Sequence, residues 1–181
     1  MSPPGRPKGE YRSAQHEGTP MTGQHRVLMV CMGNICRSPT AEVVLRHKLR
    51  ERGLDALVEV ASAGTHAYRT GDPPDERSQR HARRRGYDLS ALRARLVSNE
   101  DFERFDLILA MDWDNLELLE SQCPPAHRVK LGRLSQHARR SDSPVVPDPY
   151  LGGPAGFEQV LDLLEDACEG LAEHLGRLLK A

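Results

Sequence analysis

Apolar positions along the chain form short runs separated by longer segments of helical periodicity. A continuous apolar run such as Val27–Val30 is typical of a strand that is buried on both faces. A run at 92–97 carries the same signal more weakly. The predicted strands lie at 27–30, 58–61, 92–97 and 105–110.

The intervening segments carry helix signals. Ser38 followed by Pro39 predicts a helix start with Ser38 as N-cap, and Gly53 predicts its end. The segment 123–149 is rich in Pro, Ser and Arg and is predicted to be mostly loop. Further helices are predicted at about 75–85, at 101–105, after Asp112, and from Pro154 to 178. Strands that alternate with helices imply an α/β fold with a parallel sheet covered on both faces.

Composition narrows the picture to one ordinary domain. Residues 1–24 are polar and lack periodicity, so we expect a flexible tail before a single domain at 25–181, with Met21 as an alternative start of the native protein. The formal net charge of −1 gives no general attraction to nucleic acid or to a membrane. Neither a signal peptide nor a membrane-spanning run is apparent, and we expect a cytoplasmic protein.

The cysteines are expected to be free thiols. A reducing compartment disfavours disulfides, and the spacing of Cys and His lacks the patterns of metal sites. We therefore expect no metal and no cofactor. The four cysteines are Cys31, Cys36, Cys123 and Cys168.

Cys31 and Arg37 form a C-x5-R pattern between the first predicted strand and the first predicted helix. The backbone N–H groups of such a loop can converge on an anion, and the helix N-terminus adds partial positive charge. The planar guanidinium of Arg37 can bind two phosphate oxygens. The same positive field favours the thiolate of Cys31, which can then attack phosphorus. The pattern therefore favours phosphoryl transfer through a phosphocysteine intermediate.

The pattern also fits a simpler interpretation, in which Cys31 is a buried thiol at a strand end and Arg37 a solvated helix residue. Expelling an alkoxide or phenolate requires a proton donor. Asp148 is the candidate, because Pro147 and Pro149 stiffen its loop. Taken alone, this segment is more typical of a plain proline turn than of a catalytic loop.

Four long segments, in order, resemble the low-molecular-weight protein tyrosine phosphatases. They are VLMVCMGNICRSPTAE, SAGTHAYRTGDPPDERS, DFERFDLILAMDWDNL and VPDPYLGGPAGFEQVLDLLEDACEGL. The resemblance covers about 26–178. It implies a single flavodoxin-like phosphatase domain with a four-stranded parallel sheet and helices on both faces.

The resemblance implies roles for individual residues. Cys31 would be the nucleophile, Arg37 would bind phosphate and stabilise the transition state, and Asp148 would be general acid and then general base. Asp112 matches an acid that supports the phosphate-binding loop. The other loop residues are Met32, Gly33, Asn34, Ile35, Cys36 and Ser38.

Further roles follow from the same resemblance. Ser38 would hydrogen-bond the sulfur of Cys31. Asn34 would hold the strained loop and hydrogen-bond to Ser62. Cys36 matches a cysteine that forms a reversible disulfide with Cys31 under oxidation, although it also fits a small buried residue.

Tyr68 and Tyr150 match aromatic positions in the wall of the substrate cleft. Some family members have a second tyrosine where this chain has Leu151, which puts ring stacking and regulation at that position in doubt. His66 fits a cleft residue and a surface residue equally well. The basic run fits a docking site for acidic substrates, but a solvated helix face is the simpler interpretation; it comprises Arg77, Arg80, Arg83, Arg84 and Arg85.

Two rival functions use the same loop. A thiol-dependent arsenate reductase needs a downstream pair of resolving cysteines, and the segment 81–89 contains none. A non-catalytic phosphotyrosine-binding module would be expected to lose Cys31, Arg37 or Asp148. We therefore expect a phosphotyrosine protein as substrate, with a bacterial tyrosine kinase as one candidate, and a monomer or weak homodimer.

Overall fold

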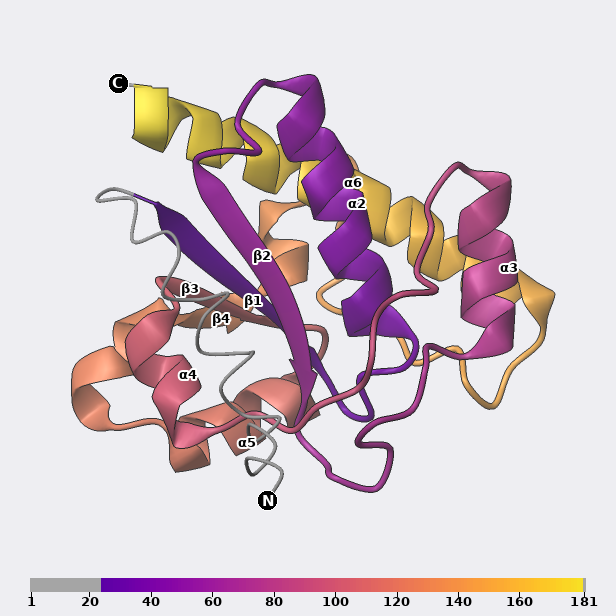
Figure 1. The fold of residues 1–181 in the computed structure, drawn as a ribbon, viewed down its shortest axis with the longest axis horizontal. Coiled ribbons are helices and arrows are strands. Elements are labelled where there is room, and N and C mark those ends of the chain that lie inside the picture. Colours follow the sequence, from indigo (N-terminus) through magenta and orange to yellow (C-terminus); the bar gives the residue numbers. More distant parts are fainter. Residues whose placement is uncertain (1–23, 181) are drawn as a thin grey trace, which may run out of the picture.

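A single parallel sheet organises the chain (Figure 1). The computed structural model describes residues 24–180, so the predicted tail at 1–24 lies almost wholly outside the described residues. The sheet order is β2-β1-β3-β4, with every neighbouring pair parallel. The strands are β1 (His25–Cys31), β2 (Val58–Gly64), β3 (Leu107–Ala110) and β4 (Leu131–Arg133). The winding reverses between β1 and β3, and ligands bind at the carboxyl edge of such a switch point.

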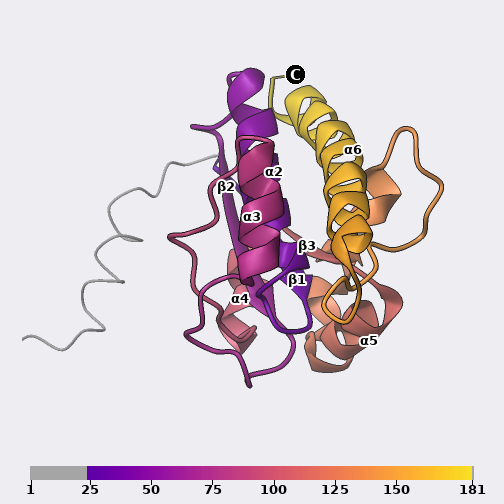
Figure 2. The same ribbon diagram turned by 90° about the vertical axis from the view of Figure 1, so that its right-hand side faces the viewer.

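Helices cover both faces of this sheet (Figure 2). One side carries α2 (Arg37–Glu51), α3 (Glu76–Arg84) and α6 (Pro154–Lys180). The other side carries α4 (Asn99–Arg104) and α5 (Trp113–Gln122). Two short 3-10 helices, η1 (Pro125–Lys130) and η2 (Leu134–His137), flank β4. No helix within residues 24–180 combines the length and the apolar character needed to span a bilayer.

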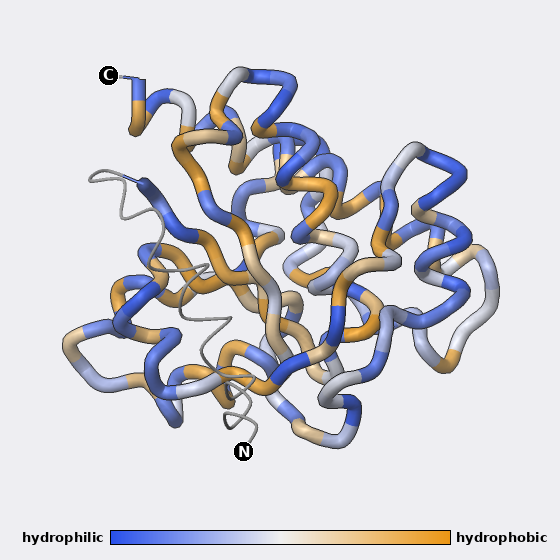
Figure 3. Tube along the Cα trace, in the orientation of Figure 1, coloured by the Kyte–Doolittle hydropathy of each residue, from blue (hydrophilic) through white to orange (hydrophobic). Residues whose placement is uncertain are grey.

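The central strand β1 explains why its sequence is apolar without alternation. Val27 and Met29 contact the layer of α2 and α6, whereas Leu28 and Val30 contact the layer of α4 and α5. All four side chains are buried. The tube coloured by hydropathy shows the same continuous apolar stretch through the sheet (Figure 3).

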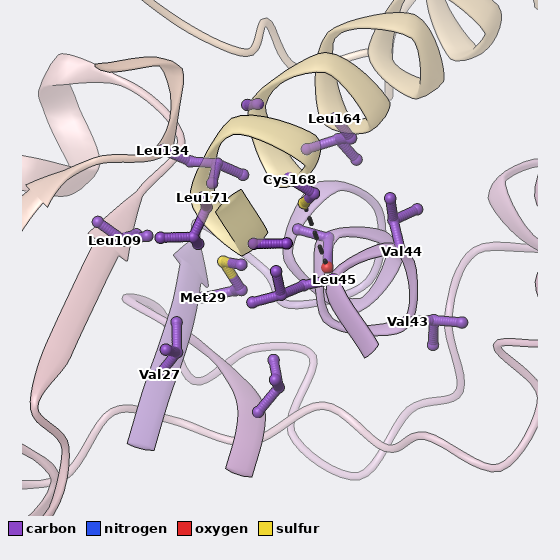
Figure 4. Close-up of a cluster of buried hydrophobic side chains, with 14 of the residues drawn as sticks. Val27, Met29, Val43, Val44, Leu45, Leu109, Leu134, Leu164, Cys168 and Leu171 are labelled. Carbon is purple, nitrogen blue, oxygen red and sulfur yellow. Dashed lines mark hydrogen bonds between the residues drawn. The ribbon is translucent and has the colours of Figure 1, made fainter. Parts of the chain in front are cut away.

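The larger core lies between β1, α2 and α6 (Figure 4). Met29, Leu45 and Leu171 meet there, each fully buried. The Cys168 sulfur lies 3.8 Å from the carbonyl oxygen of Ala41, as expected for a thiol donating to an α2 carbonyl. The prediction that Cys168 belongs to the core is therefore confirmed.

Three local predictions are wrong. The helix α2 begins at Arg37 with Cys36 as N-cap, two residues earlier than the Ser-Pro signal suggested. The weak run at 92–97 forms only an isolated bridge between Gly64 and Leu96. The fourth strand is instead β4, inside the segment predicted to be loop, and its three residues are too few to show a periodicity.

Two glycines of α6 provide a matched test of packing. A Cβ on Gly170 would overlap the carbonyl oxygen of His137, whereas a Cβ on Gly176 would lie 3.4 Å from a Leu54 methyl. Alanine normally stabilises a helix interior by about 1 kcal/mol relative to glycine. We expect Gly170→Ala to lower the free energy of unfolding by roughly 1–3 kcal/mol, because of overpacking.

Gly176→Ala is the control and is expected to leave the free energy of unfolding unchanged or to raise it by up to about 1 kcal/mol. Urea denaturation of both variants measures the difference. Equal effects would show that the His137 backbone yields and that the close approach is unimportant.

Candidate active site

The loop from Cys31 to Arg37 lies at the carboxyl edge of the sheet, where β1 leads into α2. Cys31 is the last residue of β1 and is buried, with a relative exposure of 2%. Arg37 is the first residue of α2. The backbone N–H groups at this helix start are the unpaired donors that bind anions at helix N-termini.

Asn34 holds the loop in an unusual conformation. Its φ of 57° makes it a non-glycine residue in the left-handed region. The Asn34 side-chain amide donates to the Ser38 hydroxyl at 2.8 Å, and its oxygen accepts from the Arg95 backbone N–H at 3.0 Å. Both bonds are made inside the protein, so they fix the turn from two sides.

The predicted hydrogen bond between Asn34 and Ser62 is wrong. The Ser62 hydroxyl donates to the Glu42 carboxylate at 2.7 Å, on the α2 side of β2. Burial of Glu42 raises the pKa of its carboxyl group, although Arg46 and Ser62 act in the opposite direction. Ser62 therefore connects β2 to Glu42 of α2 and makes no hydrogen bond to Asn34.

Ser38 connects Asn34 to the sulfur of Cys31. The Cys31 Sγ lies 3.0 Å from the Ser38 hydroxyl. Because Ser38 accepts from Asn34, its own proton is available to the sulfur or to the more distant Ala63 carbonyl at 3.4 Å. A hydroxyl in this position can donate a hydrogen bond to the sulfur.

Arg37 is buried rather than solvated, so the simpler interpretation of this residue is wrong. Its guanidinium donates to Asp112 at 2.6 Å and to the Val146 carbonyl at 3.0 Å. Burial alone would lower the pKa of Arg37, but Cys31, Asp112 and Asp148 together raise it. Arg37 thus stays a cation beside the sulfur.

Asp112 is fixed by two bonds of different kinds. One carboxylate oxygen accepts from the Asn115 backbone N–H at 2.8 Å and caps α5, as predicted. The other oxygen accepts from Arg37. The helix α5 therefore anchors the arginine of the loop.

Asp148 lies on the opposite side of the same arginine. Its carboxylate is 3.7 Å from the Arg37 guanidinium and is partly exposed, at 39%. It also accepts from the Tyr150 backbone N–H at 3.0 Å. The buried Val146 fixes this segment, because its N–H donates to the Met111 carbonyl at 2.8 Å.

Cys31, Arg37 and Asp148 line one small cleft with a volume of about 80 Å³. Its other lining residues are Met32, Gly33, Ile35, Cys36, Tyr68, Arg69 and Tyr150. A larger groove of about 960 Å³ lies over α6 and residues 139–141, but it contains none of the loop residues. The smaller cleft is the candidate site, because the residues predicted to be nucleophile, phosphate-binding cation and acid meet there.

Other predicted positions lie outside the cleft. His66 is exposed and hydrogen-bonds Thr65, so it is a surface residue. Leu151 is 95% exposed and makes no wall. Arg69 lines the cleft but was not identified from the sequence, because nothing local distinguishes it from a solvated arginine.

The basic run is divided between two environments. Arg77 binds Asp75 and lies over the Phe157 ring, and Arg85 forms ion pairs with Glu158 and Asp162 of α6. The remaining members are exposed; they are Arg80, Arg83 and Arg84. Part of the run is therefore structural, and its proposed docking role stays a prediction.

The sheet, the anion-binding loop and the paired arginine define a phosphatase-type α/β enzyme. Residues 26–181 match the family model described as low molecular weight phosphotyrosine protein phosphatase. A Synechocystis protein that bears the low molecular weight protein-tyrosine-phosphatase name is 46% identical over 85% of this chain and 98% of its own length. The chain belongs to this family, and it is a protein-tyrosine-phosphatase.

Solved structures agree with this assignment. The protein tyrosine phosphatase of Entamoeba histolytica, with Hepes in its active site, gives a TM-score of 0.83 at 39% identity, covering 85% of this chain and 98% of that one. Wzb of Vibrio vulnificus in complex with benzylphosphonate gives a TM-score of 0.74 at 29% identity, covering 84% of this chain and 99% of that chain. The prediction of the family and of its four-stranded parallel fold is confirmed.

Replacing Asn34 tests whether its backbone conformation is strained. Asn34→Gly keeps the left-handed φ but removes both side-chain hydrogen bonds, whereas Asn34→Ala also imposes the steric cost. We expect the alanine variant to be less stable than the glycine variant by roughly 1 kcal/mol. Chemical denaturation measures the difference, and equal stabilities would contradict the strain.

The two loop cysteines should differ in reactivity. Burial raises the pKa of Cys36 to about 12, and a hydrogen bond from Ser78 lowers this pKa by a smaller amount. We expect iodoacetamide at pH 7.5 to leave Cys36 unmodified in the folded protein and to label it only in urea, because the thiolate is the reactive form. Peptide mass spectrometry measures the labelling. Rapid modification of Cys36 in the folded protein would overturn this assignment.

Proposed function

We propose that the chain hydrolyses phosphotyrosine in proteins through a covalent phosphocysteine on Cys31. The Cys31 thiolate attacks phosphorus while the bond to the tyrosine oxygen breaks. Asp148 donates its proton to that oxygen, and tyrosine leaves. Asp148 then takes a proton from water, whose oxygen attacks phosphorus, so that inorganic phosphate leaves and the thiolate returns.

One observation carries this proposal: Cys31, Arg37 and Asp148 meet in a single cleft, with the arginine between the acid and Asp112. A guanidinium fixed in this way is available to the equatorial phosphate oxygens at no reorganisation cost. The loop N–H groups supply the remaining donors. Arg37 would thus stabilise charge that develops in the transition state.

The cleft wall favours an aromatic phosphoester. Tyr68 is 60% and Tyr150 36% exposed, and both line the cleft. An aromatic ring that stands on the loop can pack against such side chains, whereas phosphoserine is too short to reach them. We infer a phosphotyrosine protein as the substrate class.

Hydrolysis of p-nitrophenyl phosphate and phenyl phosphate in chelator and reducing agent tests the roles. We expect no turnover by Cys31→Ser. Asp148→Ala should lose roughly 10²–10⁴-fold with phenyl phosphate and less with p-nitrophenyl phosphate, because the better leaving group needs less protonation.

Matched controls separate these roles from general damage. Cys123→Ser removes a buried thiol outside the cleft, and Asp142→Ala removes an exposed carboxylate from the same segment as Asp148. Both should retain activity. An inactive wild-type protein that still binds vanadate would favour the binding module, and thiol-coupled arsenate reduction would favour the reductase.

A further inference from the structure

Arg69 is a second arginine in the wall of the cleft, on the loop after β2. It lies beside Gly33 of the phosphate-binding loop, with its Cγ 3.5 Å from where a Gly33 Cβ would be. Its side chain is about one-third exposed. Arg69 therefore reaches from the loop to the mouth of the cleft.

Two aromatic rings fix the guanidinium of Arg69. Its central carbon lies 5.7 Å from the Tyr68 ring centroid and 5.5 Å from that of Tyr150. One nitrogen also donates to the Tyr150 hydroxyl at 2.7 Å. Such contacts reduce the conformational entropy that a long side chain loses on binding a ligand.

The donors of Arg69 are mostly unused by the described part of the protein. A guanidinium has five N–H donors, and the Tyr150 hydroxyl takes one. The buried Nε has no hydrogen-bond partner. The nearest carboxylate, Asp72, is 3.9 Å away, too far for a hydrogen bond, and it is half exposed.

The other two arginines beside the cleft make more hydrogen bonds within the protein than Arg69 does. Arg37 donates to Asp112 and to the Val146 carbonyl. Arg77 donates to Asp75 and to the Tyr150 carbonyl. Positive charge that is fixed but weakly neutralised is therefore concentrated at Arg69.

We propose that Arg69 determines specificity by binding a carboxylate that flanks the phosphotyrosine of the substrate. The inference rests on the proposed function. A phosphotyrosine on the loop places the neighbouring peptide residues at the mouth, where Arg69 is exposed. Its planar guanidinium can pair with a Glu or Asp side chain through two parallel hydrogen bonds. The substrate class is thus acidic phosphotyrosine segments.

A purely structural role would have a different signature. If Arg69 only braced Tyr150, its loss would slow all peptides alike, as would Tyr150→Phe. If Arg69 binds a substrate carboxylate, its loss instead changes the ratio of the kcat/KM values for acidic and neutral peptides. The ratio of kcat/KM values for matched peptides therefore separates the two roles.

The test uses three phosphotyrosine peptides that differ only in carrying Glu, Gln or Lys on both sides of the phosphotyrosine. We expect wild-type enzyme to prefer Glu over Gln by about threefold to tenfold, mainly through KM, because a partly exposed pair is of modest strength. Arg69→Gln should bring the ratio to about one, and Arg69→Glu should favour the Lys peptide. Added salt should weaken the wild-type preference.

Two controls sharpen the result. Arg50→Gln removes the same charge at the far end of α2, 13 residues from Arg37 and thus roughly 20 Å along the helix, and should keep the ratio. Tyr150→Phe should also keep it. A Glu preference that persists in Arg69→Gln, or no preference in wild-type enzyme, overturns the inference.

Failure of the mechanism can be told apart from failure of this inference. Hydrolysis of the Gln peptide that depends on Cys31 shows that the phosphatase chemistry operates, whatever the ratio. If no peptide is hydrolysed, peptide dissociation constants measured in a Cys31→Ser background, with and without Arg69→Gln, give the same ratio. Equal affinities for the Glu and Gln peptides would then overturn the role of Arg69.

Discussion

The ion pair between Arg37 and Asp112 is the interaction on which the site depends. It joins the first residue of α2 to the N-cap of α5 across the carboxyl edge of β1 and β3. Arg37 also donates to the Val146 carbonyl, so the same side chain fixes the segment that carries Asp148. A buried guanidinium without partners would cost several kcal/mol. The pairing therefore makes the cation tolerable and, at the same time, orders three separate segments around the sulfur.

The loop itself needs support from outside its own sequence. Asn34 adopts a left-handed conformation, which typically costs on the order of 1 kcal/mol for such a residue. The Arg95 backbone and the Ser38 hydroxyl offset this cost through hydrogen bonds. Gly64 completes the support, because a Cβ there would lie 2.7 Å from the Met32 carbonyl oxygen. The close approach of β2 to the loop thus requires glycine.

The sequence predicted what depends on long or locally complete signals. Most of β1 and nearly the whole of α6 were found, because burial leaves a strong apolar pattern in each. The strand β4 was missed because its three residues, Leu-Gly-Arg, are too few to show an apolar pattern. The N-cap at Ser38 was wrong because its hydroxyl contacts Cys31 and Asn34, and tertiary contacts overrode the local Ser-Pro rule.

The candidate site shows the same division. Cys31, Arg37 and Asp148 were named from a motif and a resemblance, and the fold brings them into one cleft. The partner of Ser62 could not be derived, because it depends on which α2 residue faces β2, and that residue is Glu42. Arg69 was missed for a related reason. Its role depends on its distance to Tyr150, a residue 81 positions away in the sequence.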